Sequence, residues 1–255
     1  MLVLNRRRKL FLKLETVYFP EHYESYETDA DIVLFYLSRE NAPGARVFNT
    51  LRIHLSKSEE ELFGEISSTT RKGIRQAEKD GAYPLFIDGS PGVETVMQFC
   101  DSYDSFAVQK GIKCADRELL LMARSSGSLS ISGLKDREGR DLCGTADIHD
   151  SKIALGMYSY SHFRKFEDKL IRKQISNANR LLYWELIKYY RRAGLEVFDL
   201  GGLGMGMESK DLDTVDEFKR SFGGRIETLY HFYHGTSRLG RLVLSMSNKN
   251  NKIEY

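Results

Sequence analysis

The stretch that decides the fold runs from Ala178 to Gly224. It reads ANRLLYWELIKYYRRAGLEVFDLGGLG over 178–204 and DTVDEFKRSFGG over 213–224. The apolar residues of 176–192 recur at helical spacing, and Gly194 is placed to end that helix. LEVFDL is then a continuous apolar strand, of the kind that is buried on both faces of a sheet. A second helix is predicted over 214–222. Helix, buried strand and helix in this order indicate an α/β protein.

The elements upstream and downstream complete a mixed α/β pattern. Ser56 and Ser58 each precede a glutamate by three residues, which is a capping-box signature for a helix that follows. The predicted helices are 59–81, broken into two pieces, then 91–109, and 117–124 capped by Asp116. The predicted strands are 46–55, 83–88, 128–135, 141–149, 152–160, 225–233 and 239–244. This order predicts an α+β arrangement in which a mixed, mostly antiparallel sheet is flanked by helices. An antiparallel meander that leads into helix, strand, helix and strand is the layout of GNAT-type acyltransferases.

The chain shows no sign of division into separate domains. Its 255 residues contain four prolines, no Pro-rich linker and no repeat. We therefore expect a single GNAT-like domain over 1–255. Its core would span 46–235, N-terminal strands would occupy 1–45, and a C-terminal strand and tail would occupy 236–255.

The charge is nearly balanced, so any affinity for phosphate must come from local clustering. The 38 Lys and Arg residues face 36 Asp and Glu residues, which gives a formal net charge of +2. Arg71, Arg75 and Lys79 share one helix face because they are four residues apart. A second basic cluster is predicted in a loop before the long helix and comprises Arg164, Lys165, Lys169, Arg172 and Lys173. The alternative for each cation is an ordinary solvated surface.

The sequence offers little for metal binding or for a membrane span. Cys100, Cys114 and Cys143 are far apart, which predicts buried free thiols in a reducing compartment. His231 and His234 lie three apart on a predicted strand and so fall on opposite faces. We therefore expect no metal site. No apolar run approaches the roughly 20 residues that cross a bilayer, which indicates a cytoplasmic protein.

Two motif blocks resemble the Fem family of peptidoglycan-bridge aminoacyltransferases, within the GNAT superfamily. The downstream block joins Leu181-Leu182 and Trp184 to Gly194, Asp199-Leu200-Gly201-Gly202, Phe218-Lys219 and Phe222-Gly223-Gly224. The upstream block, RKGIRQAEKDG at 71–81, is similar to a helix end of that family. The resemblance covers residues 46 to 235 by the order of elements. It implies a GNAT-like fold and transfer of an acyl or aminoacyl group to a primary amine.

The resemblance also implies a class of acceptor, whereas it leaves the acyl donor undecided. The acceptor would be an amine of a cell-wall or surface-polysaccharide precursor, which allows peripheral contact with a lipid-linked precursor at the inner membrane surface. No permanently bound cofactor is expected, since the donor is a co-substrate. Aminoacyl-tRNA, acyl-CoA and acyl carrier protein all stay open as donors, and tRNA or a carrier protein is thus a candidate partner. Acyl-CoA is not established as the donor, because its usual phosphate loop is missing. CoA-using GNAT enzymes hold pyrophosphate on a Gly-rich loop at this place in the fold, whereas residues 174–179 here contain no glycine and end in Asn179.

Lys219 is the first candidate for catalysis, because the resemblance places a functional lysine at this position. Acyl transfer to an amine needs a positive charge or N–H groups where the oxyanion develops. Phe218 beside it, Asn179, and Gly201 with Gly202 are candidate substrate-binding residues. Arg75 joins them because it falls in the upstream motif. The alternative for Lys219 is a solvated helix lysine.

Asp199, Tyr158 and Tyr160 are further candidates, each with a structural alternative. Asp199 ends a buried strand, where carboxyl ends of sheets face ligand clefts, so it could orient the acceptor amine or accept its proton. Its alternative is to cap the Gly201-Gly202 turn. Tyr158 and Tyr160 are two apart on one strand face and could bind the acceptor or relay a proton. Their alternative is an aromatic stripe of the core.

Two other functions remain open beside a Fem-type aminoacyltransferase. One is an acyl-CoA-dependent or acyl-carrier-dependent N-acyltransferase that acts on an amino acid or small amine. The other is a non-catalytic module that binds RNA or glycan.

Overall fold

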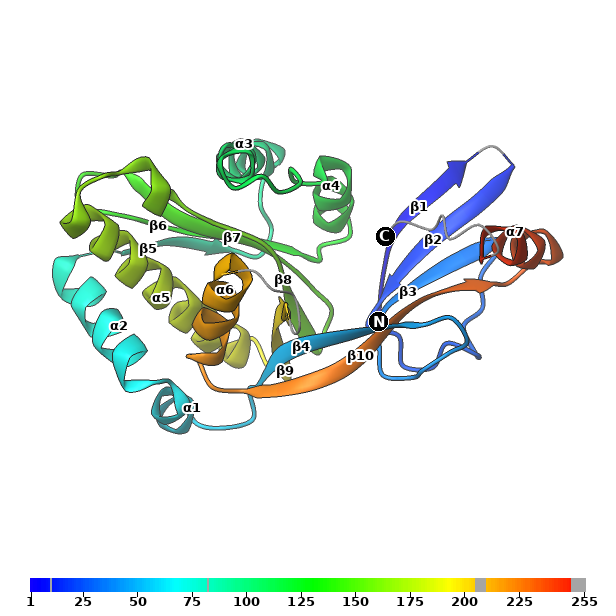
Figure 1. Ribbon diagram of the computed structural model, residues 1–255, viewed down its shortest axis with the longest axis horizontal. Coiled ribbons are helices and arrows are strands. Elements are labelled where there is room, and N and C mark those ends of the chain that lie inside the picture. Colours follow the sequence, from blue (N-terminus) through cyan, green and yellow to red (C-terminus); the bar gives the residue numbers. More distant parts are fainter. Residues whose placement is uncertain (10, 82, 205–209, 249–255) are drawn as a thin grey trace. The chain divides into compact units, whose positions relative to one another are not determined.

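A computed structural model of the chain describes residues 1–9, 11–81, 83–204 and 210–248. The chain forms two compact units. The larger unit is Leu51–Ile226, and the smaller combines Met1–Thr50 with Glu227–Tyr255. Figure 1 labels the elements of both units. The expectation of a single domain stays a prediction.

The larger unit is built on a mixed sheet with one parallel junction. Its strand order is β4-β9-β8-β7-β6-β5. The bounds are β4 Arg46–His54, β5 Tyr83–Asp88, β6 Leu129–Lys135, β7 Asp141–His149, β8 Ile153–Ser161 and β9 Val197–Gly202. The meander β5-β6-β7-β8 is antiparallel, whereas β8 and β9 run parallel. This bears out the predicted α/β, GNAT-like architecture.

Helices cover both faces of this sheet. Figure 1 shows α2 beside α5 on one face, with α3 and α4 on the other. The bounds are α1 Glu59–Glu65, α2 Ser68–Asp80, α3 Val93–Lys110, α4 Arg117–Ser125, α5 Lys169–Arg192 and α6 Lys210–Arg220. A short 3-10 turn, η1 His162–Lys165, links β8 to α5.

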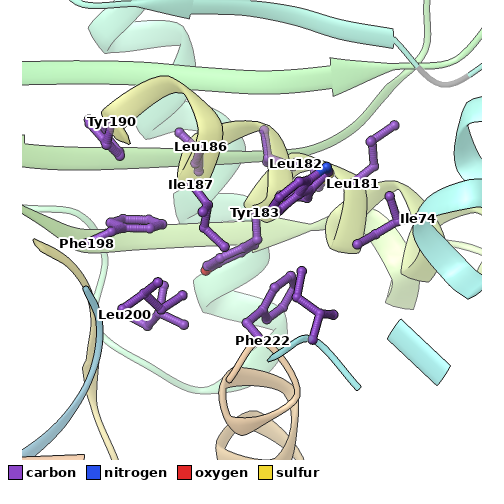
Figure 2. Packing of buried hydrophobic residues seen from close by; sticks show 14 of the residues in the cluster. Ile74, Leu181, Leu182, Tyr183, Leu186, Ile187, Tyr190, Phe198, Leu200 and Phe222 are labelled. Carbon is purple, nitrogen blue, oxygen red and sulfur yellow. The ribbon is translucent and has the colours of Figure 1, made fainter. Parts of the chain in front are cut away.

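The core of the larger unit forms where α5 packs on α2 and across the strands of the sheet. Leu181, Leu182, Leu186 and Ile187 of α5 are almost fully buried. Figure 2 shows Ile187 and Tyr183 of α5 on the side of Phe198 and Leu200 of β9 and of Phe222. Burial of one such side chain contributes about 1.5–3 kcal/mol, so this contact fixes α5 over the sheet.

Local signals set the predicted helix ends. Ser58 and Glu61 form the expected capping box of α1. The predicted break in 59–81 falls at Ile66 and Ser67, where the Ser67 hydroxyl accepts a hydrogen bond from Thr70 and begins α2. Gly81 ends α2 with φ +75°, a conformation that glycine adopts without strain.

Two predicted elements were wrong. The cluster from Lys169 to Lys173 is not in a loop, since α5 begins at Lys169. The Asp168 carboxylate accepts hydrogen bonds from Leu170 N and Ile171 N and so caps the helix early. The predicted C-terminal strand at 239–244 is part of the helix α7, Arg238–Asn248. Ser237 accepts a hydrogen bond from Gly240 N through its hydroxyl, which caps α7.

The smaller unit contributes four strands and has its own aromatic core. Its strand order is β1-β2-β3-β10, with β1 Leu2–Lys9, β2 Leu12–Tyr18, β3 Ile32–Ser38 and β10 Arg225–Gly235. The predicted N-terminal strands are therefore present. Phe35 and Phe232 are buried and pack with Tyr23, and the Phe35 and Phe232 ring centroids are 5.4 Å apart. Across the described ranges, no helix has the length and apolar character needed to cross a bilayer.

Candidate functional site

The candidate site opens where the parallel strands β8 and β9 separate. Their pairing runs from Ile153 with Val197 to Leu155 with Asp199 and goes no further. Both strands continue beyond that point, β8 to Ser161 and β9 to Gly202. The cavity that lies there measures about 430 Å³. We call it the transfer pocket.

Aromatic rings, hydroxyl groups and cations line the transfer pocket. Gly156 to Ser159 of β8 and Leu200 of β9 form its sheet wall, and α3, α5, α6 and η1 supply the rest. The described lining includes no carboxylate. Its principal side chains are Phe106, Lys110, Tyr158, Phe163, Arg164, Asn179, Tyr183, Phe218 and Lys219.

Lys219 lies in this pocket, in a fixed position. Its ammonium donates a hydrogen bond of 2.6 Å to the Gly202 carbonyl at the end of β9. Gly201 at the end of β9 has φ +79°, a conformation that other residues rarely adopt, and a Cβ there would lie only 3.3 Å from Gly156 O. Burial lowers the pKa of Lys219 below the usual 10.5, and Lys110 lowers it further, while Asp216 and Asp199 oppose the shift. An ammonium that is held and partly desolvated interacts strongly with a developing negative charge.

Phe218, the neighbour of Lys219 on α6, is held by aromatic contacts. Its ring meets that of Tyr183 edge to face at 5.1 Å, and it also packs edge to face on Phe222 at 5.2 Å. Burial raises the pKa of Tyr183 to about 12, so this phenol stays neutral. The two residues of the Phe-Lys pair therefore differ in their contacts. The Phe218 ring packs on Tyr183 and Phe222, whereas the Lys219 ammonium reaches the end of β9.

Tyr158 supplies a hydroxyl to the pocket. Its oxygen accepts a hydrogen bond of 3.1 Å from Asp116 N, at the start of α4. Its ring meets Tyr103 of α3 edge to face at 4.9 Å. Burial raises its pKa above 10.0, so the phenol keeps its proton and can donate it to a substrate oxygen.

Asn179 also lines the pocket, as predicted for a substrate-binding residue. Its Oδ1 is buried and has no hydrogen-bond partner in the protein. A buried acceptor without a partner is costly, and a substrate N–H would satisfy it. Lys219, Phe218, Tyr158 and Asn179 thus meet in one cavity, with Gly201 and Gly202 at its edge, and their roles stay predictions.

The structure corrects the expectation for Asp199. Its side chain is 0% exposed and is absent from the pocket lining. One carboxylate oxygen lies 2.8 Å from Arg52 Nε, and the other accepts a hydrogen bond from Gly201 N. Alternation along β9 puts Asp199 on the face opposite Leu200, which does line the pocket. Asp199 therefore holds the Gly201 turn, which is the alternative considered above.

Tyr160 and Arg75 also lie outside the pocket. Tyr160 is on the same side of β8 as Tyr158 but is buried against Phe99, and its hydroxyl donates to Asp141. It belongs to the core. Arg75 is exposed on α2, with its guanidinium 5.5 Å from the centre of the Phe63 ring. Helical spacing turns it away from α5, so the motif match did not place it in the site.

Several lining residues were missed by sequence reasoning. Tyr183 of α5 lines the pocket although the sequence motifs did not single it out. Phe106 and Lys110 come from α3, which no motif connects to Lys219. Cys114, expected to be buried, is exposed, while Cys100 and Cys143 are buried as predicted. Among the described residues, no group of three His, Cys, Asp or Glu side chains could hold a metal ion.

The separated parallel strands β8 and β9, with the helices that flank them, belong to a fold that solved structures share. The crystal structure of FemX aligns with a TM-score of 0.63 and 12% identity, over 94% of this chain and 85% of that one. The C-terminal domain of a putative lysylphosphatidylglycerol synthetase from Agrobacterium fabrum aligns with a TM-score of 0.53 and 14% identity, over 91% and 80% of the two chains.

A third solved structure, L-PGS from Bacillus licheniformis, aligns with a TM-score of 0.50 and 16% identity, over 85% of this chain and 72% of that one. Identities this low establish the fold alone. No protein-family model and no curated protein matches the sequence.

Proposed function

We propose that this chain is an N-acyltransferase of the Fem/GNAT type that joins an acyl or aminoacyl group to a primary amine. The observation that carries the proposal is the Lys219 ammonium, fixed on Gly202 O inside the pocket between β8 and β9. The whole chain would act as one GNAT-like domain, without a resident cofactor.

The described lining supports direct transfer without a covalent enzyme intermediate. A neutral amine attacks the donor carbonyl, and the oxyanion that forms is stabilised by Lys219 and by the Tyr158 hydroxyl. Collapse expels the donor's leaving group, which takes up the proton that the amine loses. The pocket supplies donors of hydrogen bonds for this step, and its described walls contain no carboxylate that would act as a base.

The acceptor we propose is an amine of a cell-wall or surface-polysaccharide precursor, and a lipid-linked form would bring the protein to the inner membrane surface. One structural neighbour is by name a putative lysylphosphatidylglycerol synthetase. This supports a fold that can serve amino-acid transfer onto a membrane component. An acyl-CoA-dependent or carrier-dependent enzyme for a small amine is the second candidate, favoured by the compact 430 Å³ pocket.

A donor panel tests the proposal. The purified protein is incubated with acyl-CoA, acyl carrier protein or aminoacyl-tRNA and a set of primary amines, and amide products are detected by mass spectrometry. We expect one donor class to give an amide at a rate that Lys219→Ala lowers by about 10²–10³-fold. Release of free thiol identifies a thioester donor, and strict dependence on charged tRNA identifies the aminoacyl donor. RNA or glycan binding with no amide from any donor would support the non-catalytic module instead.

A further inference from the structure

A second cavity, of about 610 Å³, lies between α2 and the first half of α5. We call it the cationic groove. Lys72 of α2 faces four cations of α5 across it, and Thr69, Gln76, Asn177 and Phe163 complete its walls. No described lining residue is acidic. The five cations are Lys72, Lys169, Arg172, Lys173 and Arg180.

These five cations have no ion pair with any described residue, unlike other arginines of the chain. Arg52, Arg117 and Arg140 each lie within 2.9 Å of a carboxylate oxygen. Most exposed charges are compensated by water, but two charges of the groove are partly withdrawn from it. The Nε atoms of Arg172 and Arg180 are buried and have no hydrogen-bond partner in the protein.

Neutral contacts hold these two guanidinium groups. Arg180 donates from one terminal nitrogen to Ser176 O at 3.0 Å and to Ser176 Oγ at 2.6 Å. Arg172 stacks over the Phe163 ring, 4.2 Å from its centre. Burial lowers the pKa of Arg180 below its usual value, since nothing acidic offsets the desolvation. A positive charge that is fixed, desolvated and uncompensated favours an anionic ligand.

Gly73 gives Arg180 the room that it occupies. A Cβ on Gly73 would lie 2.8 Å from Arg180 Cδ and 2.9 Å from Asn177 Oδ1. Any side chain at this position of α2 would displace the arginine. The two helices are thus close enough for cations from both to face one ligand.

We propose that the cationic groove binds the diphosphate group of a substrate. Planar guanidinium groups bind phosphate oxygens in pairs, and lysines add point charges. Five cations on two helices suit a diphosphate better than a single phosphate, because two phosphate groups can neutralise positive charges at both ends of the groove.

The groove borders the transfer pocket, because Phe163 and Ser176 line both. A molecule whose diphosphate lies beside Arg180 can therefore extend its other end toward Lys219. This last step rests on the proposed function, whereas the binding of a diphosphate does not.

Calorimetric titration of the full chain with inorganic pyrophosphate tests the proposal. We expect saturable 1:1 binding that weakens as salt is raised. The variant Lys72→Glu/Lys173→Glu changes two exposed groove residues and is expected to lose affinity at least about tenfold. The matched control Arg39→Glu/Arg238→Glu makes the same charge change at two exposed positions of the smaller unit and should bind within twofold of the wild type.

Competition then distinguishes the two sources of a diphosphate. Displacement of pyrophosphate by coenzyme A would assign the groove to a donor, and displacement by a nucleotide sugar would assign it to an acceptor precursor. Absence of saturable pyrophosphate binding, or equal loss in the control variant, would overturn the proposal. So would an oligoribonucleotide that binds in the groove while pyrophosphate does not. The titration needs no turnover, so it can show diphosphate binding even if the donor panel yields no amide. Equally, the donor panel can yield an amide even if pyrophosphate does not bind, so the two proposals can fail separately.

Discussion

The transfer pocket and the cationic groove lie along the same helix, α5, yet they hold positive charge in opposite ways. In the pocket, Lys219 donates a hydrogen bond to a backbone carbonyl, and its neighbour Phe218 packs on Tyr183. In the groove, five cations are held by neutral contacts or left exposed. A charge fixed to one point suits a reacting atom, whereas a spread of charges suits a polyanion that needs affinity. We therefore assign the acyl-transfer step to the transfer pocket and substrate affinity to the cationic groove. A substitution in one of them should leave the other unchanged.

The largest expected effect is a loss of activity that leaves ligand binding in the cationic groove unchanged. Lys219→Ala should lower kcat by about 10²–10³-fold, the usual cost of removing one oxyanion-stabilising donor. Pyrophosphate affinity should not change, since Lys219 is absent from the groove. Steady-state kinetics and calorimetry on the same preparation measure both. Arg220→Ala removes the neighbouring exposed cation of α6 and should stay within about twofold, and equal losses in both variants would remove Lys219 from the mechanism.

The next effect concerns what lies behind each site. The groove is backed by apolar residues such as Ile74, whereas Asp147, 1% exposed, lies behind the pocket wall. A Cβ on Gly156 would be 3.6 Å from its Oδ1. Burial raises the pKa of Asp147 to about 7, although Tyr190 and Thr145 donate hydrogen bonds to it.

This carboxyl should make stability depend on pH. The folded state keeps a proton that the unfolded chain releases near pH 4. The contribution of this carboxyl to the free energy of unfolding is therefore greatest below that pH and falls as pH rises toward 7, by up to about 1.4 kcal/mol per pH unit. Asp147→Asn should flatten this dependence in urea unfolding at pH 5 and pH 7. An unchanged slope in the variant would assign the dependence to other groups.

A smaller effect tests the charge on Lys219. Because burial lowers its pKa, activity should decline on the alkaline side at a pH below 10.5, where an ordinary lysine titrates. Lys219→Arg keeps a positive charge to much higher pH, so whatever rate it retains should persist into the alkaline range. Rate profiles of both proteins, recorded between pH 7 and pH 10.5, test this. The same alkaline decline in both would mean that another group titrates.

The smallest effect alters the groove without changing its charge. Gly73→Ala would push on Arg180 and should weaken pyrophosphate binding by about threefold. Stability should change by no more than about 1 kcal/mol, because alanine also favours the helix by roughly that amount. Calorimetry and thermal unfolding measure the two quantities. A variant with wild-type affinity would show that Arg180 adapts to the added methyl group.

Much of the fold could be predicted from residues that act locally. The capping box at Ser58 and Glu61, Gly81 at the end of α2 and the buried strand around Phe198 were all correct. The C-terminal helix α7 was mistaken for a strand. Its cap depends on Ser237, whose hydroxyl also donates to Asp31, 206 residues away in sequence.

The candidate site could be predicted only in part. Lys219, Phe218, Tyr158 and Asn179 do meet, since motif spacing follows the strands and helices that carry them. Asp199 and Tyr160 were on the right strands, but each is held by a distant partner, Arg52 and Asp141. No local pattern identifies such partners.

By itself, then, the sequence determined the order of helices and strands, the Phe-Lys and Asp-x-Gly-Gly motifs and the near balance of charge, because periodicity, caps and composition are local properties. Only the tertiary structure decided which buried carboxylate meets an arginine, where β8 and β9 separate, and which cations of α2 and α5 face each other without counter-charge. Those features depend on contacts between residues far apart in the chain, and Gly73 and Arg180 meet only because two helices pack closely.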